Sequence, residues 1–497
     1  MDDFLWENRW MNLEELVRRD EERMTPEKAE DFRRLWSKEL KRMPKNSEIW
    51  PFLTDPDLIE VFKTRGVRTE SGVAPMAVMM KPYHCPGNCV YCPLEPGMPK
   101  SYLSDEPAAQ RAKSLNFDPY LQVEMRLRQM EETGHVTDKI DIIVIGGTFG
   151  AYPDDYKKEF FKGIYDGING FVSKDIQEAI KFNETGKRRM VGMSVETRPD
   201  WITEEEIKLW REMGVTKVQM GVQAFDEKIL KKIDRGHTLE TVAEATRMCR
   251  NAGIKICYHL MPDLPGSNPE KDVEMAKMMF EDPRFGPDYL KVYPAMVIPG
   301  TELHKMWERG EYKSYDEEEL KKVLKKIKEM TPIWCRIDRL VRDISKKWVS
   351  SGSLATNMRQ MIQEELKTQK IKASKNQNAV GCQCIRCREV RGGVYDEKVE
   401  LLVNERETLG GKELFLSYEA KGKLFSMLRL RLPDKGEKLL FGELVGAAIV
   451  REVHTYGQVR EISDDRSQMS DEGKSQHRGL GKRLLVEAER IAIERGY

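Results

Sequence analysis

The sequence predicts an α/β protein with a partial (β/α)6 barrel, a zinc-braced linker region and a C-terminal mixed α+β domain. Three observations support this fold class. Six apolar runs alternate with amphipathic segments between about residues 73 and 330, and two close groups of cysteines stand at 85–92 and 382–387. Antiparallel-type strands and a glycine-rich turn follow from about residue 397. Continuous apolar strands separated by helices are typical of a parallel sheet that helices cover.

Length and composition narrow the class of protein. A chain of 497 residues suggests about three domains, and its 40% apolar and 33% charged residues suit a large core under a solvated surface. We expect neither a membrane span nor a secretory signal, because no run approaches roughly 20 apolar residues and the acidic start, MDDFLWENRW, lacks a basic head. The net charge of +0 excludes a uniformly basic protein, but not a local positive face that binds nucleic acid.

The cysteine count points to a reducing compartment. There are nine cysteines, and an odd number without a signal peptide favours metal or redox use over a disulfide framework. We therefore expect a cytoplasmic protein. Cys249 and Cys257 lie in apolar periodic segments and are expected in the core.

Residues 1–60 are expected to form a charged, helical N-terminal extension. Segments 13–23 and 26–42 have the apolar spacing of short amphipathic helices. A basic stretch in this region is either a solvated helix face or an RNA-contacting extension. It comprises Arg33, Arg34, Lys38, Lys41, Arg42 and Lys45.

Residues 61–330 carry the predicted barrel. The expected strands are 73–80, 140–147, 189–197, 217–223, 254–261 and 290–294, and the expected helices are 109–134, 154–167, 204–213, 239–252 and 269–281. Gly134, Gly214 and Gly253 stand at or just after helix ends, where a glycine commonly stops a helix. In barrels of this kind the functional groups gather at the carboxyl ends of the strands.

The loop after the first expected strand holds Cys85, Cys89 and Cys92 with the spacing C-x3-C-x2-C. Three thiolates can hold three irons of a [4Fe–4S] cube and leave the fourth iron open to a small molecule. By spacing alone, a zinc knuckle that lacks one ligand, or that takes His84 as its fourth, is equally consistent. The second strand ends in Gly146-Gly147-Thr148, which exposes backbone groups at the strand end.

Residues 331–395 break the β/α rhythm and carry the second cysteine group, Cys382, Cys384 and Cys387. A closed tetrahedral zinc site needs a fourth ligand, and Cys335 at the start of the same region is the candidate. Such a structural zinc would brace the domain junction and has no open position for catalysis. The alternative is that the three cysteines are reduced and unliganded.

Residues 396–497 are expected to form the mixed α+β domain, which ends in a helix over 482–495. The turn before this helix contains Gln476, Gly479 and Gly481. Glycines let the backbone approach a pyrophosphate, and the free amides at a helix start bind its charge. A lone G-x-G is also compatible with a simple turn.

These features resemble two known families. The cysteine loop and the glycine pair resemble the radical S-adenosylmethionine (SAM) superfamily, and the C-terminal strands with the Q-x-x-G-x-G turn resemble the GNAT-type acetyltransferases. Both in one chain resemble the Elongator catalytic subunit family from about residue 61 onward, on segments such as VMMKPYHCPGNCVYCP, DKIDIIVIGGTF, DRGHT, MPDLPG and SQHRGLG. Relatives continue through another strand and helix, so the resemblance implies that the GNAT-like domain is incomplete here.

The family resemblance implies a tRNA carboxymethyluridine synthase, an acyltransferase-class enzyme that makes 5-carboxymethyluridine at the anticodon wobble position. It implies a [4Fe–4S] cluster, SAM, acetyl-CoA as substrate and a structural Zn²⁺. A SAM-derived radical would remove hydrogen from the acetyl methyl group, because an unactivated C–H bond is beyond a base of ordinary pKa. The implied partners are the tRNA anticodon stem-loop and an electron donor, and a homodimer is compatible with the sequence.

The resemblance also implies roles for single residues. Cys85, Cys89 and Cys92 would ligate the cluster, and Gly146, Gly147 and Thr148 would meet SAM. Glu196, Arg198 and Gln223 would position SAM or the uracil, unless they form salt bridges at the barrel mouth. Acetyl-CoA would contact Lys139, Glu452, Val453, His454, Thr455, Gln476, Gly479, Leu480, Gly481 and Lys482. By sequence alone, however, Lys139 would be an ordinary surface lysine and His454 equally a core histidine.

Chemistry on a wobble base requires the nucleotide to leave its stack, and basic side chains around the cleft must then hold the loop. The candidates are Lys81, Arg111, Lys113, Arg126, Arg128 and Arg235. Two rival functions remain open. A protein lysine acetyltransferase with a structural iron–sulfur cluster would not need the open iron, and a non-catalytic tRNA-binding subunit would fit the incomplete GNAT-like end.

Overall fold

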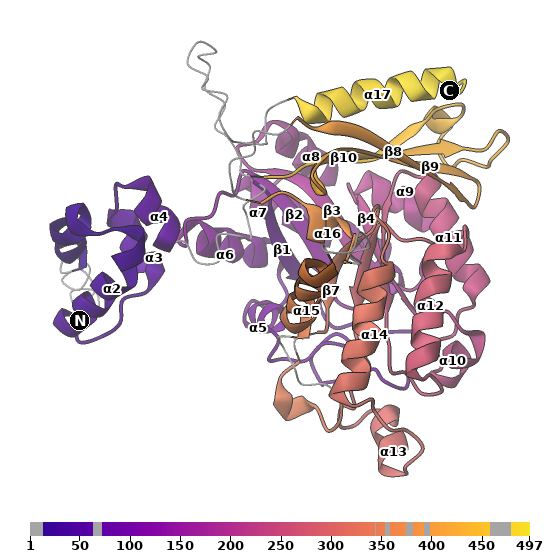
Figure 1. Ribbon diagram of the computed structural model, residues 1–497, viewed down its shortest axis with the longest axis horizontal. Helices are drawn as coiled ribbons and strands as arrows, with labels where there is room; N and C mark the ends of the chain where they lie inside the picture. The colour runs from indigo at the N-terminus through magenta and orange to yellow at the C-terminus, as the bar shows by residue number, and fades with distance from the viewer. Residues whose placement is uncertain are drawn as a thin grey trace.

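The computed structural model describes residues 13–62, 72–342, 344–352, 358–373, 381–391, 398–457 and 479–497. Within these ranges the chain forms an N-terminal helical unit, a parallel sheet with helices around it and a smaller antiparallel sheet (Figure 1). No helix in these ranges combines the length and the apolar character needed to cross a membrane.

The N-terminal helical unit projects to one side of the main body (Figure 1). It has a helix over residues 13–20, then α2 (Ala29–Glu39), α3 (Asn46–Ile49) and α4 (Pro56–Phe62). Trp36 is fully buried at its centre and donates from Nε1 to Asp20 at 2.9 Å. Arg33 and Arg42, two members of the basic stretch, each pair with a glutamate of the same unit, so these two charges are neutralised locally.

Seven parallel strands form the main sheet, in the same order in space as along the chain. They are β1 (Ala74–Met79), β2 (Lys139–Ile145), β3 (Arg189–Thr197), β4 (Lys217–Gln223), β5 (Lys255–Leu260), β6 (Tyr289–Val292) and β7 (Arg336–Leu340). The first six lie where the sequence predicted them. The prediction of six strands was one too few, because the charged sequence of β7, RIDRL, shows no apolar run and this strand forms by pairing with β6.

Helices follow each of the first six strands, and most begin at a side-chain cap such as Asp118, Thr203 or Asp316. They are α5 (Pro107–Ser114), α6 (Pro119–Glu131), α7 (Asp154–Asn169), α8 (Ile176–Thr185), α9 (Glu204–Glu212), α10 (Glu227–Lys232), α11 (Leu239–Asn251), α12 (Pro269–Glu281), α13 (Glu302–Glu308) and α14 (Glu317–Met330). The asparagine, aspartate and threonine caps satisfy the free amides of the first helical turn.

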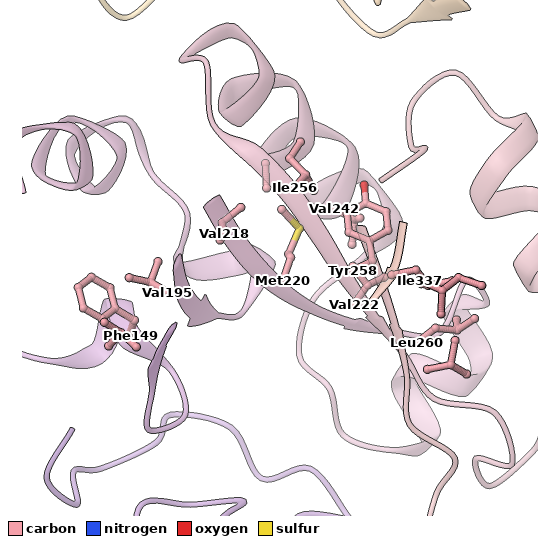
Figure 2. Packing of buried hydrophobic residues seen from close by; sticks show 14 of the residues in the cluster. Phe149, Val195, Val218, Met220, Val222, Val242, Ile256, Tyr258, Leu260 and Ile337 are labelled. Atoms are coloured by element: carbon pink, nitrogen blue, oxygen red, sulfur yellow. The ribbon is translucent and has the colours of Figure 1, made fainter. Parts of the chain in front are cut away.

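The strands bury one face and leave the other for polar side chains. In β4, Val218, Met220 and Val222 belong to the apolar core that Figure 2 shows. The alternate residues of the same strand, Gln219, Gly221 and Gln223, line a cavity on the inner face. This period of two is what a strand dictates, because successive side chains point to opposite faces.

The region predicted as a linker packs on the barrel. Besides β7, it contains α15 (Met358–Ala373) and α16 (Ile385–Arg388). Met358, Ile362 and Leu366 of α15 are buried in the same apolar core as the main sheet. The sequence analysis assigned no helix here, although Met358, Ile362 and Leu366 stand four residues apart, which is the spacing of one helix face.

The second sheet has the order β11-β10-β9-β8 and is antiparallel throughout. Its strands are β8 (Glu400–Thr408), β9 (Gly411–Ala420), β10 (Lys423–Pro433) and β11 (Ile449–Thr455). The helix α17 (Leu480–Glu494) lies across this sheet (Figure 1), and Leu480, Leu484 and Ile491 pack into its apolar core. The mixed α+β character predicted for this part of the chain is therefore present.

Buried charged side chains join the second sheet to the first. Arg451 of β11 donates to both carboxylate oxygens of Asp288, each at 2.7 Å, and to the carbonyl of Ile254 at 3.1 Å. Arg429 of β10 donates to the carbonyl of Trp334 at 2.7 Å. Ile254, Asp288 and Trp334 come shortly before β5, β6 and β7. The second sheet therefore packs against the amino ends of these strands.

Candidate active site

A cavity of about 840 Å³ lies at the carboxyl ends of the parallel strands. Residues just beyond several strand ends line it, including Thr148 after β2, Arg198 after β3 and Arg342 after β7. Inner-face residues such as Ile143 and Lys291 extend the lining down into the sheet. The end of the sheet that the sequence predicted for chemistry is therefore the end that carries the large cavity.

Cys85, Cys89 and Cys92 all line this cavity, on the loop that follows β1. Cys89 is buried and the other two are partly exposed. The Sγ of Cys85 lies 3.4 Å from Oγ1 of Thr148, so the cysteine loop reaches the carboxyl end of β2. Burial raises the pKa of the Cys92 thiol to about 12 in the absence of any metal. A metal that replaces the proton removes that cost, because the thiolate is the ligand.

The spacing of the sulfurs distinguishes the two cysteine groups. Four ligands at about 2.3 Å around one zinc ion lie about 3.8 Å apart in a tetrahedron. The sulfurs of Cys382, Cys384 and Cys387 lie within 4.8 Å of one another. Among the described residues, the sulfurs of Cys85, Cys89 and Cys92 do not all lie within 4.8 Å of one another. His84, which precedes Cys85, is exposed. The wider spread of these sulfurs suits a multi-iron cube better than a single zinc ion.

The glycine pair after β2 has a backbone that other residues rarely adopt. Gly146 has φ +144° and Gly147 has φ +97°. A Cβ on Gly146 would lie 3.0 Å from the Cβ of Met80, so the position is crowded as well as strained. Gly147 and Thr148 line the cavity, whereas the carbonyl of Gly146 accepts a hydrogen bond from the hydroxyl of Tyr152 at 3.1 Å.

All three predicted catalytic residues, Glu196, Arg198 and Gln223, line the cavity. Arg198 makes a double hydrogen bond to Asp200, at 2.9 and 2.8 Å, which leaves its Nη1 buried without a partner in the described chain. Gln223 has φ +73°, and its Oε1 is also buried and unpartnered among the described residues. Buried polar atoms of this kind commonly mark the place of a ligand. These two residues of the cavity lining therefore hold an unused donor and an unused acceptor among the described residues.

Glu196 has partners that sequence reasoning did not identify. The hydroxyl of Tyr102 donates to its carboxylate, and Nζ of Lys291 lies 3.6 Å from the same carboxylate. Burial opposes the charged form of Lys291, but the nearby Tyr293 and Glu196 hold the pKa of this lysine above its ordinary value. Lys291 occupies the inward position of β6, and this alternation is the signal that could have found it.

The second cysteine group lies where α16 meets β7. The backbone amide of Ile385 donates to the carbonyl of Cys335 at 3.0 Å, so Cys335 is a neighbour of the group. Its sulfur nevertheless lies outside the set of three that meet within 4.8 Å. Hydrogen bonds from Cys382 and Cys387 lower the pKa of Cys384 to about 2, which favours a thiolate there. The trio fits a metal ion, and Cys335 as its fourth ligand stays a prediction.

The residues predicted to bind acetyl-CoA lie at several separate positions in the structure. Gly481 at the start of α17 lies against β11, since a Cβ on it would be 3.6 Å from Oγ1 of Thr455 and 3.7 Å from Cγ1 of Val453. Gly479, Leu480 and Lys482 share that helix start, where Lys482 is exposed. Gln476 lies outside the described residues. The helix start and the Val453 face of β11 are therefore brought together.

Glu452 and His454 occupy the alternate positions of β11. Glu452 is buried at the junction, where it accepts a hydrogen bond from Nε of Arg429 at 2.8 Å and another from the hydroxyl of Tyr289. His454 stacks on Tyr456 with ring centroids 4.3 Å apart, and burial lowers its pKa to about 4. Lys139 is the first residue of β2, at the amino edge of the main sheet. The side chains of Glu452, His454 and Lys139 therefore do not lie beside the start of α17.

The basic side chains predicted to contact tRNA also lie in different settings. Arg111 and Arg126 line the cavity, and Lys81 lies 4.4 Å from the centre of the Tyr156 ring. Lys113 and Arg128 are exposed on α5 and α6. Arg235, by contrast, is only 6% exposed and lies inside the cavity wall.

Comparisons with known proteins agree with this geometry. Residues 81–279 match the Radical SAM superfamily, and residues 287–368 match the Radical_SAM C-terminal domain. A protein named tRNA uridine(34) acetyltransferase from Methanocaldococcus jannaschii is 40% identical over 469 residues, which cover 91% of this chain and 84% of that protein. Elongator complex protein 3 of Homo sapiens is 38% identical over 457 residues, covering 88% of this chain and 80% of that one.

A solved structure is similar over most of the chain. The archaeal Elp3 of Methanocaldococcus infernus with an N-terminal deletion matches with a TM-score of 0.72 and 37% identity, over 86% of this chain and 92% of that one. The two radical SAM matches, the long matches to these relatives and the cysteine-lined cavity lead to one assignment. The chain belongs to the family of radical SAM proteins that contains the tRNA uridine(34) acetyltransferases and Elongator complex protein 3.

Proposed function

We propose that this protein forms 5-carboxymethyluridine at the wobble uridine of tRNA, with acetyl-CoA as the source of the added carbon atoms. The names of its relatives refer to acetyl chemistry at uridine 34 of tRNA. The observation that carries the proposal is one cavity that gathers Cys85, Cys89 and Cys92 with the strand-end residues Thr148 and Arg198. A cytoplasmic location suits an enzyme that depends on reduced cysteines.

The three cavity cysteines would hold the iron–sulfur cluster and leave one iron without a protein ligand. When cluster and SAM are bound there, they supply a 5′-deoxyadenosyl radical, which can take hydrogen from an unactivated methyl group. The residues present fit these groups. Nη1 of Arg198 offers a hydrogen bond to an anionic or carbonyl oxygen, Oε1 of Gln223 accepts one, and Gly147 leaves its backbone open to close approach.

The inner wall of the cavity can hold a polar base. Lys291 is partly buried beside Glu196, which holds its pKa above the ordinary value, so it can donate to a carbonyl oxygen of a uracil ring. Tyr102 donates to Glu196, which fixes that carboxylate and keeps an oxygen as acceptor for an N–H of the base. Arg111 and Arg126, on the same wall, can meet the phosphates of an anticodon loop.

Acetyl-CoA would bind at the second sheet. The start of α17 offers free backbone amides at Leu480, Gly481 and Lys482, which is the usual setting for a pyrophosphate. The absence of a side chain at Gly481 keeps the Val453 and Thr455 face of β11 accessible. We also propose that Cys382, Cys384 and Cys387 hold a structural zinc ion, because a trio of close sulfurs suits a tetrahedral site.

The test is anaerobic reconstitution of the full chain with iron and sulfide, then incubation with tRNA, SAM, acetyl-CoA and a reductant. Mass spectrometry of the digested tRNA should show carboxymethyluridine. Cys89→Ala should abolish the product, whereas Cys249→Ala, a buried cysteine outside both groups, should retain it.

Three results would overturn the proposal. Product formation by Cys89→Ala would refute the radical step, and SAM-independent acetylation of a peptide lysine would instead favour a protein acetyltransferase. Binding of tRNA without any SAM cleavage by the reconstituted wild-type chain would indicate a non-catalytic subunit.

A further inference from the structure

One buried arginine touches the cysteine loop. Arg235 follows α10, is 6% exposed, and donates from Nη1 to the Sγ of Cys89 at 3.3 Å. Its Nε donates to the carbonyl of Gly221 on β4 at 3.1 Å. The guanidinium therefore bridges the inner face of the sheet and the central cysteine of the loop. Its burial shows that it is not a surface contact for RNA.

The arginine is held in place from several sides. A Cβ on Gly221 would lie 2.6 Å from its Nη2, so the bare backbone at this position leaves room for the guanidinium. Nη2 of Arg198 donates to the carbonyl of Arg235 at 2.7 Å. The amide of Val90, in the cysteine loop, donates to the carbonyl of Ile233 at 3.1 Å. The segment that carries Arg235 is thus tied to the loop by backbone as well as by side chain.

The charge of Arg235 lacks a carboxylate partner. Within the described chain, no aspartate or glutamate oxygen lies within 4.0 Å of its guanidinium. A buried charge without compensation is strongly destabilising. The sulfur of Cys89 is in hydrogen-bond contact with this charge, whereas Asp200 acts on it only from a greater distance.

We propose that Arg235 is a positioning residue that raises the reduction potential of the cluster held through Cys89. The inference rests on the proposed iron–sulfur site. Reduction adds one negative charge to the cluster, and a cation that hydrogen-bonds to a ligand sulfur stabilises the more negative form. Without Arg235 the cluster is therefore harder to reduce.

The experiment is a redox titration of the reconstituted full chain, followed by the paramagnetic signal of the reduced cluster. Arg235→Met should lower the ratio of reduced to oxidised cluster at least tenfold at the wild-type midpoint, which corresponds to a shift of about 59 mV for one electron. Arg235→Lys keeps the charge and should shift the midpoint less, in the same direction. Iron content and circular dichroism check that each variant loads and folds.

A matched control uses Arg342, another arginine of the cavity wall. It donates to the carbonyl of Ser101 at 2.8 Å and pairs with Glu106 at 2.6 Å, away from the cysteine sulfurs. Arg342→Met should therefore leave the midpoint close to that of the wild type.

The possible results separate the two claims. If Arg235→Met binds its cluster but has the midpoint potential of the wild type, the inference is wrong, while the cluster assignment stands. If the methionine variant loads too little iron, the neutral and polar Arg235→Gln decides, and an unchanged midpoint in that loaded variant refutes the inference. A wild-type chain that holds no cluster would overturn the proposed function as well.

Discussion

Replacing Arg451 with methionine would break the centre of the junction between the two sheets. The change removes two hydrogen bonds of 2.7 Å to Asp288, across the junction, and three to Glu413 of the same sheet, two at 3.1 Å and one at 2.5 Å. Both carboxylates are buried, with side chains 1% and 5% exposed, so water cannot replace the lost partner without opening the junction. Removing one partner of a buried ion pair costs about 3–5 kcal/mol.

The assay is urea denaturation followed by circular dichroism and tryptophan fluorescence, at neutral pH. We expect Arg451→Met to lose about 3–5 kcal/mol of unfolding free energy, and Arg451→Lys to lose less because it keeps the charge. Arg490→Met, which removes an exposed arginine of α17, should leave the midpoint nearly unchanged. A loss below about 1 kcal/mol in Arg451→Met would refute the view that this network holds the sheets together.

Three further predictions concern other parts of the molecule. Metal analysis of Cys384→Ser should show roughly one equivalent of zinc less than the wild type, and an unchanged content would remove the zinc site. Gly146→Ala should destabilise the chain by about 1–3 kcal/mol in the same denaturation assay, because φ is +144° and the new Cβ would press on Met80; an equal midpoint would contradict this. Burial alone would raise the pKa of Glu452, but Lys255 and Arg429 hold it at about 2. Because the pKa of Glu452 in the folded protein lies below its value in the unfolded chain, its stabilising contribution is present above about pH 4.5 and is lost as the pH falls toward 2. The urea midpoint should therefore fall less steeply with acid in Glu452→Gln than in the wild type. Equal slopes for the two proteins would contradict this prediction.

The arrangement of the main sheet followed from local patterns. The alternation in β4 separates the apolar Val218 and Met220 from Gln219, and it predicts which side chains face the cavity. The cysteine loop and the glycine pair were equally visible, because both are short motifs at strand ends. The strand β7 was missed because it carries arginines and an aspartate, and only its neighbour β6 makes it a strand.

Contacts between distant segments could not be predicted from the sequence. Glu196, Lys291 and Tyr102 come from β3, β6 and the loop after β1, so their meeting depends on the order of the strands in space. Arg235 was expected to contact RNA because its charge is obvious in the sequence, whereas its burial against Cys89 is a tertiary property. The acetyl-CoA residues stay predictions, and Gln476 lies outside the described chain.

The ionic junction constrains the acetyl transfer that we propose. It fastens the second sheet to the amino ends of β5, β6 and β7, while the cysteine-lined cavity opens at the carboxyl ends. A hinge that swung the two sites together would have to separate Asp288 from Arg451 and Arg429, its buried partners on the second sheet. The junction therefore holds the two parts together, and in the reaction that we propose the acetyl group would have to cross the distance between them.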